Sequence, residues 1–154
     1  MIDLAHIHPM LVHFPIVLSL VGVGLEFLVM ALGADPAEHR CLSNVALATL
    51  LLGAVAAIVA AFFGDIALDK AASLGFPRDP METHAEFGFT TMWLFIVLSL
   101  AYLFAWWRRV SLTGWKGWAL FLIGLAGVVL VLTTAYHGGD LVYRIGVNVA
   151  PVKP

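Results

Sequence analysis

The first apolar run of the chain opens with His6-Ile7-His8-Pro9-Met10-Leu11-Val12-His13-Phe14-Pro15 and continues to Gly33. Three imidazoles therefore stand at the mouth of a segment that is long enough to cross hydrocarbon. An ionisable ring near a lipid core is unfavourable unless it has a partner or a function. This stretch predicts a membrane helix that begins with chemically active side chains.

The composition places the whole chain in a membrane. Of its 154 residues, 62% are hydrophobic and 12% are charged, whereas soluble domains have about 45–50% apolar and about 25% charged residues. The formal net charge of -2 provides no basic surface, so nucleic acid is not expected as a partner. One cysteine gives neither an internal disulfide nor a cysteine-based metal or c-type haem motif.

Four apolar runs approach the roughly 20 residues that a helix needs to span a bilayer. They cover residues 10–32, 45–63, 87–107 and 115–136. Short connections predict that neighbouring helices run antiparallel. We therefore predict one all-α domain over residues 1–154, a four-helix transmembrane bundle with its N- and C-termini on the same side. The acidic start at Asp3, with no Lys or Arg before the first run, predicts a retained helix rather than a cleaved signal peptide.

Two Asp-Pro-x-Glu motifs are typical of helix N-termini. Asp35-Pro36-Ala37-Glu38 precedes the second run, and Asp79-Pro80-Met81-Glu82 precedes the third. In each motif we expect Asp to be the N-cap, Pro to lie in the first turn and Glu to lie at the third helical position. In the first helix, Pro15 predicts either a kink or an irregular segment before it.

The sequence also indicates where helices end. Residues 65–74 are expected to continue the second helix as an amphipathic extension, which the following Gly-Phe-Pro ends. Gly138 and Gly139 are expected to cap the C-terminus of the fourth helix. Residues 140–149 alternate in polarity, and we predict that they form an extended segment across the end of the bundle.

Topology alone brings five histidines to one end of this bundle. In four antiparallel spans, the starts of the first and third helices and the end of the fourth lie on the same side. The five are His6, His8, His13, His84 and His137. His39 belongs to a loop at the opposite end. Imidazoles from three helices close to the membrane boundary predict a shared site.

Imidazoles that different membrane helices present to one site are typical of b-type cytochromes. The leading hypothesis is one haem b, or two, bound without covalent attachment. The candidate ligands are His8, His13, His84 and His137. Gly88 and Thr91 follow His84 on one face of the third helix, where a glycine leaves room for a flat macrocycle. Arg144 is expected to meet a haem propionate or to pair with Asp140.

Two alternatives use the same residues. His8, His13, His84 and His137 also suit a single transition-metal ion such as zinc, copper or iron. In the second alternative, the protein is a cofactor-free structural subunit whose histidines only anchor the helix ends. Separately, Glu26 inside the first helix predicts either a proton relay or an ion pair with Arg40 or Arg108.

Positive charge suggests the orientation. Arg108, Arg109 and Lys116 crowd one short loop against helix ends, where the positive-inside rule is strongest. We expect that loop in the cytoplasm and the histidine cluster on the outer, periplasmic side. Membrane lipid is then the first partner of the chain.

Two end motifs resemble a known family. They are His8-Pro-Met-Leu-Val-His13-Phe-Pro-Ile and Thr-Ala-Tyr-His137-Gly-Gly-Asp-Leu-Val-Tyr-Arg-Ile-Gly-Val. They are similar to those of the bacterial predicted-membrane-protein family called domain of unknown function 2231, and the resemblance covers nearly the whole chain. It implies a four-helix protein of the bacterial inner membrane, and family members occur joined to or near cytochrome-like redox proteins. The resemblance therefore favours an electron-transfer subunit of a larger redox complex over a stand-alone enzyme.

Overall fold

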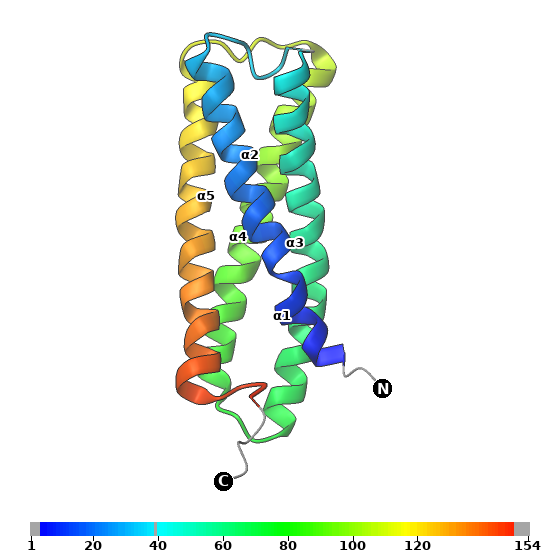
Figure 1. The fold of residues 1–154 in the computed structure, drawn as a ribbon, viewed down its shortest axis with the longest axis vertical. Helices are drawn as coiled ribbons and strands as arrows, with labels where there is room; N and C mark the ends of the chain where they lie inside the picture. Colours follow the sequence, from blue (N-terminus) through cyan, green and yellow to red (C-terminus); the bar gives the residue numbers. More distant parts are fainter. Residues whose placement is uncertain (1–3, 39, 150–154) are drawn as a thin grey trace.

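The computed structural model of the protein describes residues 4–38 and 40–149, and over these ranges every regular element is a helix (Figure 1). In chain order they are η1 (Leu4–His6), α1 (Ile7–Leu11), α2 (His13–Ala31), α3 (Cys41–Ser73), α4 (Arg78–Arg108), α5 (Trp115–Asp140) and η2 (Leu141–Ile145). Four helical segments are long and apolar enough to cross a membrane: Leu4–Ala31, Cys41–Ser73, Arg78–Arg108 and Trp115–Ile145. The predicted all-α bundle of four spans is confirmed.

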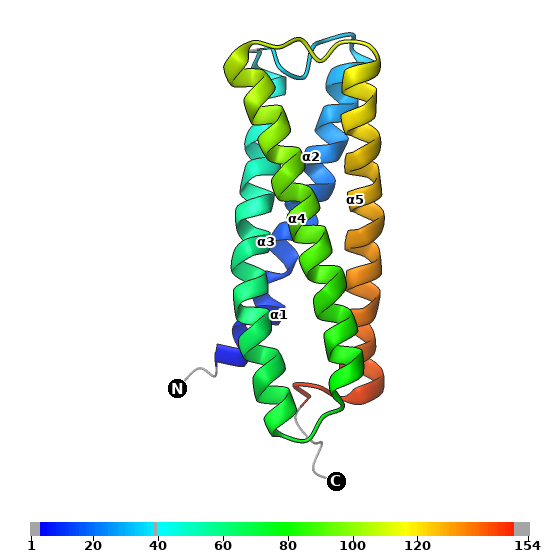
Figure 2. The same cartoon turned by 180° about the vertical axis from the view of Figure 1, so that it is seen from behind.

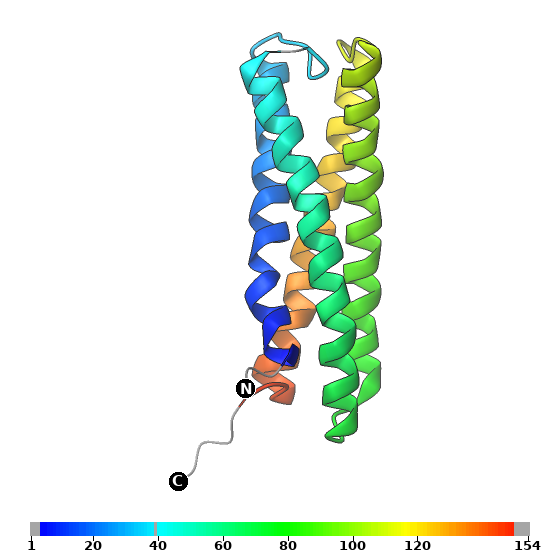
Figure 3. The same cartoon turned by 90° about the vertical axis from the view of Figure 1, so that its right-hand side faces the viewer.

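The helices form an antiparallel bundle in which α2, α3, α4 and α5 follow one another and α5 returns to contact α2. Seen from behind, α4 lies between α3 and α5 (Figure 2). In Figure 3, α3 crosses obliquely from beside α2 at one end to beside α4 at the other. The segments η1 and η2 lie at one end of the bundle, and residues 32–38 and 109–114 lie in loops at the other. We call these the histidine end and the loop end.

Large apolar side chains occur both inside the bundle and on its outer surface. Leu50, Phe95 and Tyr102 are almost completely buried, whereas Phe62 and Leu132 are exposed, as are many other apolar side chains. A water-soluble protein rarely exposes so much apolar surface in continuous patches. This surface is the one that lipid covers in a spanning bundle.

The N-terminal span is interrupted one turn before Pro15. Helix α1 ends at Leu11 and α2 begins at His13, although Val12 keeps helical angles and its N–H donates to the His8 carbonyl at 3.1 Å. Pro15 has no N–H to donate to the carbonyl of Leu11, four residues earlier. The predicted effect of this proline is therefore seen as a gap in the hydrogen-bond ladder at Leu11.

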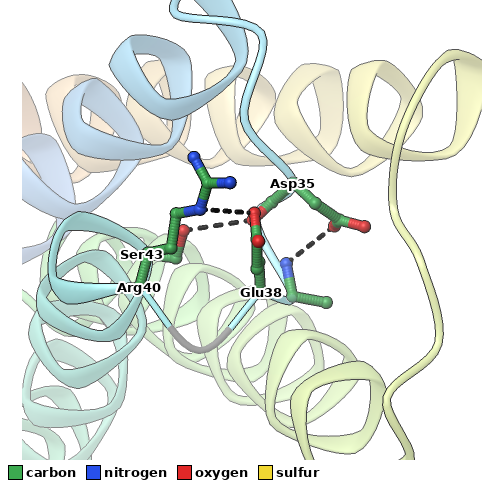
Figure 4. Close-up of polar contacts among 5 residues, drawn as sticks. Asp35, Glu38, Arg40 and Ser43 are labelled. Carbon is green, nitrogen blue, oxygen red and sulfur yellow. Dashed lines mark hydrogen bonds and ion pairs between the residues drawn. The ribbon is translucent and has the colours of Figure 1, made fainter.

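The prediction that Asp35 caps the second helix is wrong. Helix α3 begins at Cys41, and Asp35 Oδ1 instead accepts backbone N–H bonds from Ala37 at 2.9 Å and Leu112 at 3.0 Å. Ser43 donates its hydroxyl to the Asp35 carbonyl (Figure 4). Asp35 thus ties together the two loops of the loop end, a role that depends on a partner 77 residues away.

The second predicted cap is displaced by two residues. Helix α4 begins at Arg78 with Pro77 as its N-cap, so Asp79 lies in the first turn instead of capping it. A carboxylate in the first turn still interacts favourably with the helix dipole. The amphipathic extension of the second helix is confirmed, because α3 continues to Ser73 and Gly75 follows with φ +89°.

The predictions for the C-terminal region are wrong. Helix α5 continues through Gly138 and Gly139 to Asp140, and a π-helical turn follows instead of an extended segment. The turn ends at Gly146, which has φ +79°. Continuing the helix brings Val147 onto Ala71 and Met81 in a small apolar cluster at the histidine end. Apolar burial therefore outweighs the low helix propensity of two glycines.

Candidate histidine site

His8 is fixed against α3. It lies in α1, and its Nδ1 is 2.8 Å from the backbone carbonyl oxygen of Ala60. The imidazole also lies against Gly64, where an added Cβ would be 3.1 Å from Cε1 and 3.2 Å from Nδ1. A carbonyl oxygen only accepts hydrogen bonds, so Nδ1 carries the hydrogen and Nε2 keeps its lone pair.

His84 is fixed in the same manner against α5. It lies in α4, and its Nδ1 is 3.1 Å from the carbonyl oxygen of Thr134. An added Cβ on Gly138 would be 3.0 Å from its Cε1. The two histidines therefore share a pattern: Nδ1–H donates to a helix carbonyl, and a glycine of the same helix lets the ring approach.

The two rings face one another inside the histidine end. Their centroids are 6.1 Å apart and their planes are inclined by 81°. Two imidazoles that bind opposite sides of one metal atom through Nε2 have centroids about 6.3 Å apart, given metal–nitrogen distances of about 2.0 Å. The observed centroid distance of 6.1 Å is close to this value, and a neutral ring whose Nδ1–H donates to a carbonyl keeps on Nε2 the lone pair that a metal ligand needs.

His137 lies next to this pair. Its imidazole stacks on Phe87 with ring centroids 5.1 Å apart and planes inclined by 10°, and Tyr136 meets it edge-on. His137 also precedes Gly138, the glycine against which His84 packs. His137 therefore lies near the His8–His84 pair, although its ring packs against an aromatic side chain.

His13 is on the outer surface of the bundle. It is the first residue of α2, and its side chain is exposed, as are His6 and Phe14. The prediction for His39, at the loop end, lies outside the described residues. The structure thus brings together His8, His84 and His137.

The remaining predicted site residues have ordinary packing roles. An added Cβ on Gly88 would meet only Thr134 Cγ2, at 3.8 Å, so this glycine faces α5 at normal contact distance. Thr91 donates to the Phe87 carbonyl at 2.7 Å, and its Oγ1 lies 3.2 Å from the Thr134 hydroxyl. Arg144 pairs with Asp140 at 3.0 Å on the exposed surface, which is one of its two predicted roles.

No group of three His, Cys, Asp or Glu side chains within residues 4–38 and 40–149 is placed to hold one metal ion. The alternative of a bare metal ion therefore gains no donor set from this structure. Sequence reasoning also missed Gly64 and the carbonyls of Ala60 and Thr134. The sequence shows these residues, but it does not show which imidazole each one faces.

A family model described as "Predicted membrane protein (DUF2231)" matches residues 5–151. The chain belongs to this family. The match includes both histidines of the facing pair and both glycines that their rings contact. No curated protein and no solved structure matches the chain. The family description establishes a membrane protein but names no activity. Any function must therefore be inferred from the geometry of the histidine site.

Proposed function

We propose that this member of the family is a membrane cytochrome b in which His8 and His84 bind one b-type haem. The observation that carries the proposal is the facing pair of imidazoles, 6.1 Å apart, with Nδ1 of each ring held by a helix carbonyl. When bound, such a haem carries one electron between its ferric and ferrous states. The protein would then serve electron transfer as a subunit instead of acting as a stand-alone enzyme.

The donor set supports haem over a bare metal ion. Zinc sites in proteins use three or four protein ligands, and no such group is found among the described residues. A haem brings its own nitrogen ligands, so two protein imidazoles, those of His8 and His84, would be enough to hold it. Two facing histidines without a neighbouring carboxylate ligand therefore fit haem better than an ion alone.

The residues around the pair would orient it and tune it. The carbonyls of Ala60 and Thr134 fix the ring tautomer and raise the basicity of the ligating nitrogens. Gly64 and Gly138 let both rings lie close to the helix backbone, so the imidazoles cannot rotate freely. The apolar helix faces around them would exclude water and so help to set the reduction potential.

We further propose the bacterial inner membrane as the location, with the histidine end on the periplasmic side. Arg108, Arg109 and Lys116 support this orientation because all three are exposed at the loop end, and basic residues next to helix ends favour the cytoplasm. A redox protein or a larger membrane complex would then exchange electrons with the histidine end. Lipid surrounds the four spans.

An absorption spectrum of the detergent-purified protein, produced with haem supplied, tests the proposal. We expect a Soret band and reduced α and β bands in the wild type and in His6→Ala, the exposed-histidine control. His8→Ala and His84→Ala should each lose most of the bound haem. Wild-type protein without a Soret band would overturn the proposal, and bound metal found by elemental analysis would then favour the ion.

The variants also test the ligand pair separately from the cofactor. If His8→Ala and His84→Ala retain the wild-type spectrum while His13→Ala or His137→Ala loses it, the haem stands and the ligand assignment is wrong. Circular dichroism and size-exclusion chromatography check that each variant is folded. A variant that loses haem but keeps its helix content and elution volume is a ligand variant.

A further inference from the structure

Glu26 is a buried acid without a hydrogen-bond partner. It lies in α2, it is 1% exposed, and neither of its carboxyl oxygens has a partner among the described residues. The predicted ion pair with Arg40 or Arg108 is wrong. Arg40 pairs with Glu38 at 2.9 Å, and the Arg108 guanidinium lies over the Trp107 ring at 5.8 Å.

Tyr102 faces Glu26 from α4. It is 2% exposed, and its hydroxyl also lacks a partner within the part of the chain described. The two side chains line one small pocket, to which α3 contributes Leu50 and α5 contributes Leu120, Phe121 and Gly124. Tyr102 is therefore the titratable group that faces Glu26, and the other walls are apolar. Ser99, another buried hydroxyl without a partner there, lies one turn earlier on α4.

The size of the pocket restricts what Glu26 can bind. The space between the walls has no room for a water molecule, so a hydrated ion is excluded. Magnesium and calcium require six or more oxygen ligands, and the pocket offers one carboxyl and one phenol. An isolated carboxylate in such surroundings is strongly unfavourable. The ligand that the carboxyl can hold here is a proton.

We propose that Glu26, beside Tyr102 in the same pocket, is a proton-binding site in the core of the bundle that exchanges with water at the loop end. Glu26 is five residues from the end of α2, about 7–8 Å along the axis, and Tyr102 is six residues from the end of α4, about 9 Å. The α2 start at His13 is about 20 Å away. The loop end is therefore the shorter route to water.

A hydrogen bond between the two side chains can form with either group as the donor. The acid O–H donates to the Tyr102 hydroxyl oxygen, or the Tyr102 O–H donates to the acid carbonyl, and either bond would satisfy atoms that now lack a partner. Release of the proton leaves a carboxylate that the Tyr102 O–H can stabilise as a donor. This proposal is independent of haem binding, because Glu26 and the facing histidines lie in opposite halves of the bundle.

Infrared difference spectroscopy of the purified protein at pH 7 tests the proposal. The wild type should show the C=O stretching band of a protonated carboxyl group, which Glu26→Gln lacks. Glu86→Gln is the matched control, because Glu86 is an exposed acid of α4, and it should keep the band. Transfer to D₂O should shift the band, since the proton exchanges with solvent.

Tyr102→Phe gives a second test that keeps the carboxyl group. Loss of the phenol should move the C=O band to higher frequency, because a hydrogen bond to the acid is removed. Identical spectra of the wild type and Glu26→Gln at pH 7 would overturn the proposal. So would a band that remains unshifted after a day in D₂O, because the acid would then be sealed from water. If Glu26→Gln does not fold, the wild-type and Tyr102→Phe spectra decide between these outcomes.

Discussion

Replacing Gly127 by alanine tests whether α5 packs against α4 as closely as the structure indicates. A Cβ at this position would lie 2.7 Å from Leu94 Cδ2, and 2.9 Å and 3.0 Å from Phe95 Cζ and Cε2. Normal carbon–carbon contacts are about 3.5–4.0 Å. Because the Phe95 side chain is 1% exposed, it has little free space to move into. The new methyl group must therefore separate the helices or strain the ring.

The magnitude follows from two opposing effects. Overpacking in a filled core costs about 1–3 kcal/mol, whereas replacing a helical glycine by alanine stabilises by about 0.5–1 kcal/mol. Gly24 is the matched control, because it lies in α2 and an added Cβ there meets nothing within 4 Å. The difference in unfolding free energy between Gly127→Ala and Gly24→Ala isolates the packing effect, about 1–3 kcal/mol.

Equilibrium unfolding from mild detergent into sodium dodecyl sulfate provides the assay, with the five tryptophans as fluorescent reporters. Gly127→Ala should unfold at a lower mole fraction of dodecyl sulfate than Gly24→Ala. Thr134 lies two turns further along the same face of α5, so the variant should also weaken the contact between Thr134 and His84. Equal stability of the two variants would refute the close approach of α5 to α4.

Two further predictions concern polar contacts outside the core. Asp35→Ala leaves the buried N–H of Leu112 without an acceptor, and we expect a loss of about 1–3 kcal/mol in the same unfolding assay. Burial raises the pKa of Asp35, but hydrogen bonds from Ser111 and from backbone N–H groups outweigh it, so the pKa lies below its usual range. The stability that Asp35 contributes is therefore complete above about pH 4 and is lost as the pH falls through the lowered pKa of Asp35. If the unfolding free energy of an Asp35→Asn variant fell with decreasing pH in the same way as that of the wild type, this reasoning would be contradicted. Arg144→Ala removes an exposed pair with Asp140 and should change the unfolding free energy by no more than about 0.5 kcal/mol, and a larger loss would assign Arg144 a role beyond this pair.

The sequence by itself determined the number of spans, their antiparallel order and the end at which the histidines gather. Each of these features depends on local quantities: the length of an apolar run, the shortness of a connection and the parity of four crossings. A run of about 20 apolar residues has one stable solution in lipid, which is a helix. His8, His84 and His137 share one end because, in four antiparallel spans, the first and third helices start and the fourth helix ends on the same side. This conclusion requires no knowledge of packing.

The tertiary structure decided which residues meet. Asp35 has the local signature of a helix cap, yet it binds a loop 77 residues away. Gly138 has the signature of a helix end, yet it lies inside α5, where His84 packs on it, and the segment that follows packs Leu141, Ile145 and Val147 onto the apolar cluster at the histidine end. The rotation and tilt of each helix set these contacts, and they result from side-chain packing along its whole length. Residues distant in sequence contribute to that packing, so no local pattern encodes the contact between His8 and His84 or the pocket that Glu26 and Tyr102 share.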